Sequence, residues 1–101
     1  MKTLESIVQK IVLGYEPDKI FVFGSYATDT VVADSDLDLL IVKNTQIPFY
    51  KRSREVRKFL YGTKTPMDLL IYTDQELSNA EQDKYSVVYQ ALQHGKLIYA
   101  K

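Results

Sequence analysis

The sequence predicts an α/β (α+β) fold in which helices pack against a mixed β-sheet. Some segments repeat apolar residues at helical spacing, and others are short apolar runs of strand length. In chain order these segments give helix, strand, strand, helix, strand, helix and strand, an order that favours a sheet covered by helices. The chain has 101 residues, of which 46% are hydrophobic, which suits one core. We therefore expect residues 1–101 to form one domain.

The N-terminal part predicts a helix followed by a strand. Residues 3–13 repeat apolar side chains at i, i+3, i+4, i+7 and i+8, and these are Leu4, Ile7, Val8, Ile11 and Val12. Gly14 and Pro17 are expected to end this helix. The apolar run at 19–23 predicts the first strand.

The middle of the chain predicts a central strand, a second helix and a third strand. Residues 37–42 are apolar on both faces after Asp38, which is typical of a strand covered on both sides. Residues 48–61 read as a helix, with proline in the first turn and Gly62 just past the end. Residues 65–72 form the third predicted strand.

The C-terminal part contains two motifs that resemble capping boxes. Thr73 with Glu76 and Ser78 with Glu81 each have the spacing of such a box, so we expect a short helix and then a longer one. The longer helix has an apolar stripe that we expect in the core, formed by Tyr85, Val88, Tyr89 and Leu92. Gly95 should end it, and residues 97–100 should add an edge strand.

The predicted helix at 48–61 is rich in cations, which are Lys51, Arg52, Arg54, Arg57 and Lys58. The simpler interpretation, which we favour, is a solvated helix face. The alternative is that some of these cations contact a triphosphate or an acidic partner. The sequence alone leaves both interpretations open.

The chemistry is expected where the first two predicted strands meet. Gly24 and Ser25 follow the first strand, and glycine lets a backbone come close to a ligand. Asp36 and Asp38 stand at the start of the second strand, on one face, with Cα atoms roughly 6.6 Å apart. Two carboxylates that close repel each other unless a cation lies between them or one of them takes a proton. Mg²⁺ suits the site because it binds carboxylate oxygens together with substrate phosphates.

These residues resemble the pattern of the nucleotidyltransferase superfamily that includes DNA polymerase beta, and in particular the minimal nucleotidyltransferases. The pattern is Gly24-Ser25, a spacer of about ten residues, Asp36-Leu-Asp38, and a third carboxylate on a later strand, here Asp68. The resemblance implies that Asp36 and Asp38 bridge two Mg²⁺ ions and that Asp68 binds only the catalytic ion. It also implies that Gly24 and Ser25 hold the β- and γ-phosphates of ATP.

Three other residues in this region bear on the site. Thr28 stands where relatives often have arginine, and Asp29 where they often have glycine. Asp34 is a further carboxylate near the pair, and we interpret it as a loop residue rather than a metal ligand.

The resemblance also implies an activity and a partner. Stand-alone minimal nucleotidyltransferases resemble antitoxins that transfer AMP from ATP to a tyrosine of a HEPN-type ribonuclease toxin. We take this adenylyl transfer as the leading interpretation. A binding antitoxin that acts by contact alone is one alternative, and a small-molecule adenylyltransferase of the antibiotic-modifying type is another.

Composition excludes several other classes. The formal net charge is zero, so no global field favours nucleic acid or an acidic membrane surface. The chain has no cysteine and one histidine, His94, so neither disulfides nor a thiolate zinc site is expected. No signal peptide or membrane-spanning apolar run is visible, so a cytoplasmic location is expected. The sequence does not decide between a monomer, a homo-oligomer and a complex with a partner.

Overall fold

The computed structural model of the chain describes residues 2–23, 37–63 and 66–101. Its elements are α1 (Lys2–Tyr15), β1 (Lys19–Phe23), β2 (Leu37–Val42), α2 (Phe49–Arg57), the 3₁₀-helix η2 (Lys58–Leu60), β3 (Met67–Tyr72), α3 (Asp74–Glu81), α4 (Val87–His94) and β4 (Lys96–Ala100). The predicted α/β class is therefore confirmed.

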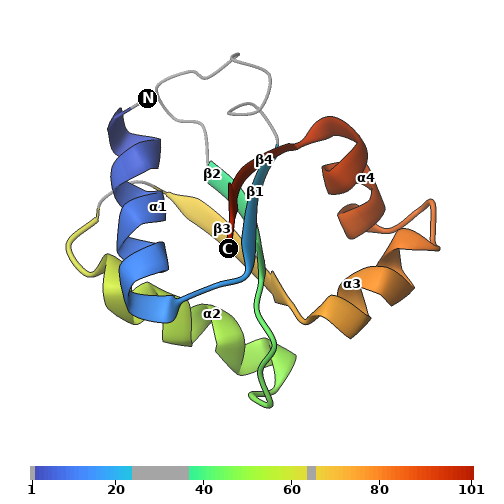
Figure 1. Ribbon diagram of the computed structural model, residues 1–101, viewed down its shortest axis with the longest axis horizontal. Helices are drawn as coiled ribbons and strands as arrows, with labels where there is room; N and C mark the ends of the chain where they lie inside the picture. Colours follow the sequence, from blue (N-terminus) through green and yellow to red (C-terminus); the bar gives the residue numbers. More distant parts are fainter. Residues whose placement is uncertain (1, 24–36, 64–65) are drawn as a thin grey trace.

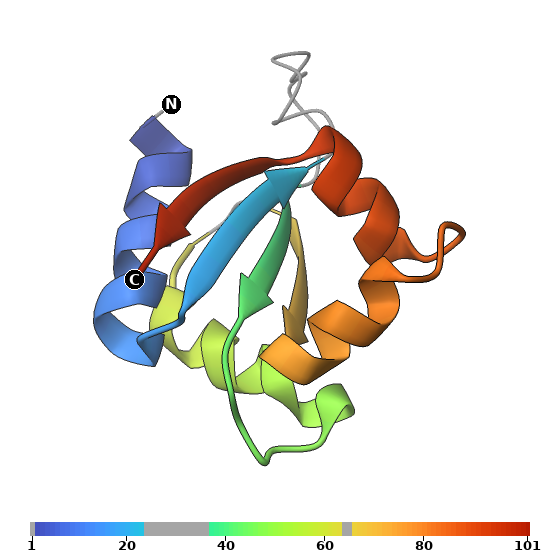
Figure 2. The same ribbon diagram turned by 45° about the vertical axis from the view of Figure 1, so that its right-hand side comes forward.

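The four strands form a mixed sheet in the order β3-β2-β1-β4 (Figure 2). β2 is parallel to β3 and antiparallel to β1, and β4 is antiparallel to β1. The strand expected at 97–100 is β4, and it lies at an edge of the sheet. The strand expected at 65–72 is β3, which begins at Met67, while residue 65 lies outside the described residues.

Helices cover both faces of the sheet, with α1 and α2 on one face and α3 and α4 on the other (Figure 1). Successive residues of β2 point to opposite faces, so Leu39 packs in the cluster that contains Ile11 of α1 and Val56 of α2. Leu40 packs in a second cluster with Leu77 of α3 and Val88 of α4. These contacts confirm that β2 is a central strand.

The C-terminal end of α1 differs from the expectation. Gly14 does not end the helix, which continues to Tyr15, and Glu16 then takes a positive φ of 54°. Gly14 is needed for packing instead, because a Cβ there would lie 2.2 Å from Cδ1 of Phe59. The Lys43 ammonium donates to the carbonyls of Tyr15 at 2.7 Å and Glu16 at 3.1 Å, and so caps the helix end.

The helix expected at 48–61 is divided into α2 and η2, and Gly62, with a φ of 88°, lies two residues after the end of η2. The large apolar side chains of this segment are only partly buried. Val56 and Leu60 are buried, whereas Phe49 is 48% exposed and Phe59 is 41% exposed. Phe49, the first residue of α2, packs against the ring of Tyr72, with ring centroids 5.3 Å apart.

One of the two expected capping boxes is present. The Thr73 hydroxyl accepts from the amide of Glu76 at 3.2 Å, and the Glu76 carboxylate accepts from the amide of Thr73 at 2.8 Å. The box expected at Ser78 and Glu81 is wrong, because both residues lie inside α3. A helix already nucleated at Thr73 continues through Ser78.

The start of α4 also differs from the expectation. The hydroxyl of Ser86 accepts from the amide of Tyr89 at 2.9 Å, as an N-cap does, and α4 begins directly after Ser86. Tyr85 therefore precedes the helix and is 96% exposed, so its expected place in the core is wrong. Val88 is buried and Leu92 packs against the same cluster, as expected.

The buried cation Arg52 joins α2, β3 and α3. Its side chain is 7% exposed. The guanidinium donates to the carbonyl of Ile47 at 2.8 Å and to that of Ile71 at 3.1 Å. It also forms a two-pronged ion pair with Glu76, at 2.5 and 3.3 Å. The expectation of a solvated face is therefore wrong for Arg52.

This ion pair predicts an acid-sensitive contribution to stability. The hydrogen bond from Arg52 lowers the pKa of Glu76 from its ordinary value of 4.5, and the amide of Thr73 adds to the effect. Because the pKa is lower in the folded chain, the contribution is present above pH 4.5 and is lost as the pH falls through the folded pKa. Thermal unfolding between about pH 6 and pH 3 should show a shallower acid loss of Tm for Glu76→Gln than for the wild type. The control is Glu81→Gln at an exposed position of the same helix, and an identical acid profile for Glu76→Gln would contradict the prediction.

Candidate active site

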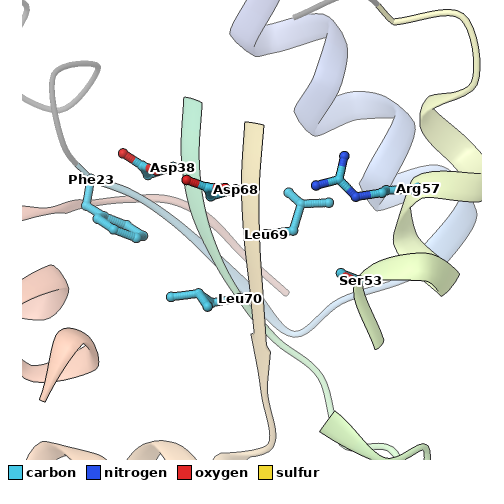
Figure 3. A pocket seen from close by; sticks show the side chains of 7 residues that line it. All are labelled: Phe23, Asp38, Ser53, Arg57, Asp68, Leu69 and Leu70. Atoms are coloured by element: carbon cyan, nitrogen blue, oxygen red, sulfur yellow. The ribbon is translucent and has the colours of Figure 1, made fainter. Parts of the chain in front are cut away.

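Asp38 and Asp68 lie directly beside one another on adjacent strands. β2 and β3 are parallel, and their register pairs Asp38 with Asp68. Both side chains project on the same face of the sheet (Figure 3). Neighbouring strands lie about 4.8 Å apart, so the two carboxylates occupy one small region at the start of both strands.

The antiparallel neighbour β1 ends at the same place. Its last residue, Phe23, pairs with Asp38. The end of β1 and the start of β2 thus lie at the same end of the strands as the two carboxylates. Figure 3 shows the Phe23 ring near Asp38 and Asp68.

A pocket of about 470 Å³ surrounds this carboxylate pair and reaches α2. Its lining residues are Phe23, Asp38, Ser53, Arg57, Asp68, Leu69 and Leu70. In Figure 3 the aspartates lie on one side of β3, and Arg57 and Ser53 lie on the other side. The pocket therefore joins an acidic wall to a wall that carries a cation and a hydroxyl group.

Arg57 is held in position by the strand that carries Asp68. Its guanidinium donates to the carbonyl of Met67 at 3.0 Å, one residue before Asp68. Sequence reasoning did not single out Arg57 or Ser53 as site residues. The cluster of cations at 48–61 was a signal, but it did not show which of them reaches the pocket.

Several expected site residues lie outside the described part of the chain. These are Gly24, Ser25, Thr28, Asp29, Asp34 and Asp36. Of the three carboxylates expected at the site, the structure therefore places Asp38 and Asp68 together.

The chemistry of the described donors fits a hard divalent cation. Carboxylate oxygens are the ligands that Mg²⁺ prefers, and two of them face one pocket here. Within residues 2–23, 37–63 and 66–101, no group of three or more His, Cys, Asp or Glu side chains is placed to hold a metal ion. A complete ligand set would thus need a further group such as Asp36, substrate phosphate or water.

Comparisons with solved structures agree with this architecture. A Sulfolobus solfataricus protein described as a nucleotidyltransferase matches with a TM-score of 0.65 and 19% identity, over 99% of this chain and 79% of that one. A toxin–antitoxin complex with AMP-PNP matches with a TM-score of 0.66 and 23% identity, over 96% of this chain and 73% of that one. A mutant of the toxin–antitoxin pair MntA–HpeT matches with a TM-score of 0.63 and 15% identity, with the same coverage. At these identities the likeness establishes a shared fold.

The family is established by a sequence model. No curated protein matches the chain closely enough to count as a relative. The model of the family described as polymerase beta, nucleotidyltransferase matches residues 5–101. That span includes β1, β2 and β3 together with the paired Asp38 and Asp68. The chain therefore belongs to the polymerase beta nucleotidyltransferase family.

Proposed function

We propose that this protein transfers AMP from ATP to a hydroxyl group of a partner protein. The observation that carries the proposal is the pairing of Asp38 with Asp68 at one pocket, in a chain of the nucleotidyltransferase family. Two of the similar structures are toxin–antitoxin complexes, and one of them contains AMP-PNP. They support an antitoxin role for this chain. In this proposal the acceptor is a tyrosine of a HEPN-type toxin and the reaction takes place in the cytoplasm.

The proposed reaction balances as a simple displacement. The acceptor oxygen forms a bond to the α-phosphorus of ATP, and the bond from that phosphorus to the bridging oxygen of the β-phosphate breaks. Pyrophosphate leaves with the electron pair, and the hydroxyl proton passes to solvent.

The residues proposed to serve this reaction are those at the start of β2 and β3 and those after β1. Asp36, Asp38 and Asp68 would hold two Mg²⁺ ions, and Gly24 and Ser25 would hold the leaving phosphates. Bound Mg²⁺ supplies positive charge that neutralises the attacking and leaving oxygens.

Transfer of label from ATP tests the proposal. The protein is mixed with ATP labelled on the α-phosphate, Mg²⁺ and an extract of its source cells, and labelled protein bands are sought. We expect a band with the wild type and none with the Asp36→Asn/Asp38→Asn double variant. The identity of the labelled band names the acceptor.

The outcomes separate the proposal from its two alternatives. Label in a small molecule instead of a protein would favour a small-molecule adenylyltransferase. A protein that binds the toxin but neither binds nor turns over ATP would be an antitoxin that acts by contact alone. Either result would overturn the proposed protein adenylylation.

A further inference from the structure

α2 and η2 carry most of their charge as cations, although the chain as a whole has as many acidic as basic residues. Their charged residues are Lys51, Arg52, Arg54, Arg57 and Lys58 with the single acid Glu55. Arg52 is buried and forms an ion pair with Glu76, and Lys58 pairs with Glu55 at 3.1 Å. Among the residues that the structure describes, no carboxylate forms an ion pair with Arg54 or Arg57.

Three exposed side chains form a stripe along α2 that ends at the pocket. Tyr50, Arg54 and Arg57 are spaced at i, i+4 and i+7, so they share one face of the helix. Tyr50 is 77% exposed, and both arginines are exposed. Arg57 lines the pocket with the carboxylates, and its bond to the Met67 carbonyl fixes it there.

The stripe extends beyond the pocket and is long enough for a short peptide segment. From Tyr50 to Arg57 the helix rises about 10 Å, which is the length of about three extended residues. A triphosphate at the carboxylates could reach Arg57, whereas Arg54 and Tyr50 lie further along the helix and do not line the pocket. Exposed tyrosine and arginine are the side chains that protein interfaces favour.

We propose that Tyr50, Arg54 and Arg57 form a docking surface for an acidic segment of the acceptor protein, next to the hydroxyl group that is modified. The inference rests on the proposed transfer to a protein. The acceptor would lie across β3, with its hydroxyl near Asp38 and Asp68 and its acidic residues against the two arginines. These cations would also offset the repulsion between an acidic acceptor and the aspartates of the site.

Peptide binding tests the surface without requiring turnover. The probe is a fluorescein-labelled ten-residue peptide with one central tyrosine flanked by glutamates, and its match replaces every glutamate with glutamine. In fluorescence anisotropy at low salt, we expect the wild type to bind the glutamate peptide at least about tenfold more tightly than the glutamine peptide. Raising the salt should reduce this preference, because the contacts are exposed.

Variants of equal charge change locate the binding surface. Arg54→Gln/Arg57→Gln should weaken binding of the glutamate peptide at least about tenfold. Lys10→Gln/Lys19→Gln removes two exposed cations from α1 and β1 and should change it less than about twofold. Arg54→Gln alone is a second probe, since Arg54 makes no hydrogen bond to β3 among the described contacts.

Three results would overturn the inference. One is equal affinity of the wild type for the glutamate and glutamine peptides. Another is an equal loss of affinity for the glutamate peptide in Arg54→Gln/Arg57→Gln and in Lys10→Gln/Lys19→Gln. The third is that Arg54→Gln/Arg57→Gln binds a fluorescent ATP analogue more weakly but binds the glutamate peptide as the wild type does. That result would make the nucleotide the ligand of Arg57. If the label-transfer experiment fails while the acidic peptide still binds at this surface, the proposed catalysis is wrong and the docking surface stands.

Discussion

Asp68→Asn is expected to reduce transfer of AMP at least about 100-fold while leaving the chain folded. Asp68 is exposed and pairs in register with Asp38, so asparagine fits the same space but brings no negative charge to the pocket. Loss of one of two neighbouring carboxylates also relieves their repulsion. We therefore expect Tm to be unchanged or slightly higher, a combination typical of a residue selected for function rather than stability.

The measurement is label transfer to the acceptor beside thermal unfolding of the same preparation. Asp83→Asn is the matched control, because Asp83 is exposed in the turn before α4 and lies outside the pocket. The control should keep full activity. Wild-type activity in Asp68→Asn would remove this residue from the site, whereas a large fall in Tm would give it a structural role.

Arg52→Ala is expected to destabilise the fold by about 3 kcal/mol or more. The substitution removes a buried guanidinium and leaves the carbonyls of Ile47 and Ile71 without their donor. Glu76 also loses its partner, although part of that loss is screened because its side chain is 40% exposed. For a chain of this size the corresponding fall in Tm is about 12 °C or more.

Chemical denaturation of the variants measures this effect. Arg54→Ala makes the same change at an exposed position of the same helix and should alter stability by less than about 0.5 kcal/mol. Glu76→Gln and the double variant complete a cycle that isolates the coupling between the two charges. A loss below about 1 kcal/mol for Arg52→Ala would show that the ion pair and its two carbonyl bonds contribute little.

The sequence predicts most strands because their signal is local. Residues 37–42 are apolar except for Asp38, and β2 has those limits. The errors arise where the same local pattern has two meanings. Ser78 with Glu81 has capping-box spacing, but α3 has already started at its Thr73 cap, so the motif is part of the helix. Tyr85 fits a helical stripe, but the cap at Ser86 places it before α4.

The site could be predicted only in part, for a related reason. Asp38 and Asp68 meet because β2 and β3 are parallel and in a particular register, and the expectation that they meet came from the family resemblance. Whether a cation of α2 is buried or lines the pocket depends on its contacts with residues that are distant in the sequence. Arg52 is buried because Glu76 lies 24 residues later, and Arg57 reaches the pocket because it bonds to Met67.

The hydrogen bonds from α2 to β3 also protect the sheet against unwanted pairing. β3 ends the sheet on the side of the candidate active-site pocket, and an uncovered edge strand can recruit a strand from another molecule. The carbonyls of Pro66 and Tyr72 accept from the amides of Leu37, in β2, and Lys43, just after it. Those of Met67 and Ile71 accept from Arg57 and Arg52. Two side chains of α2 thus occupy backbone carbonyls of β3 that a strand from another molecule would need for pairing. We therefore expect α2 to reduce aggregation through this edge of the sheet.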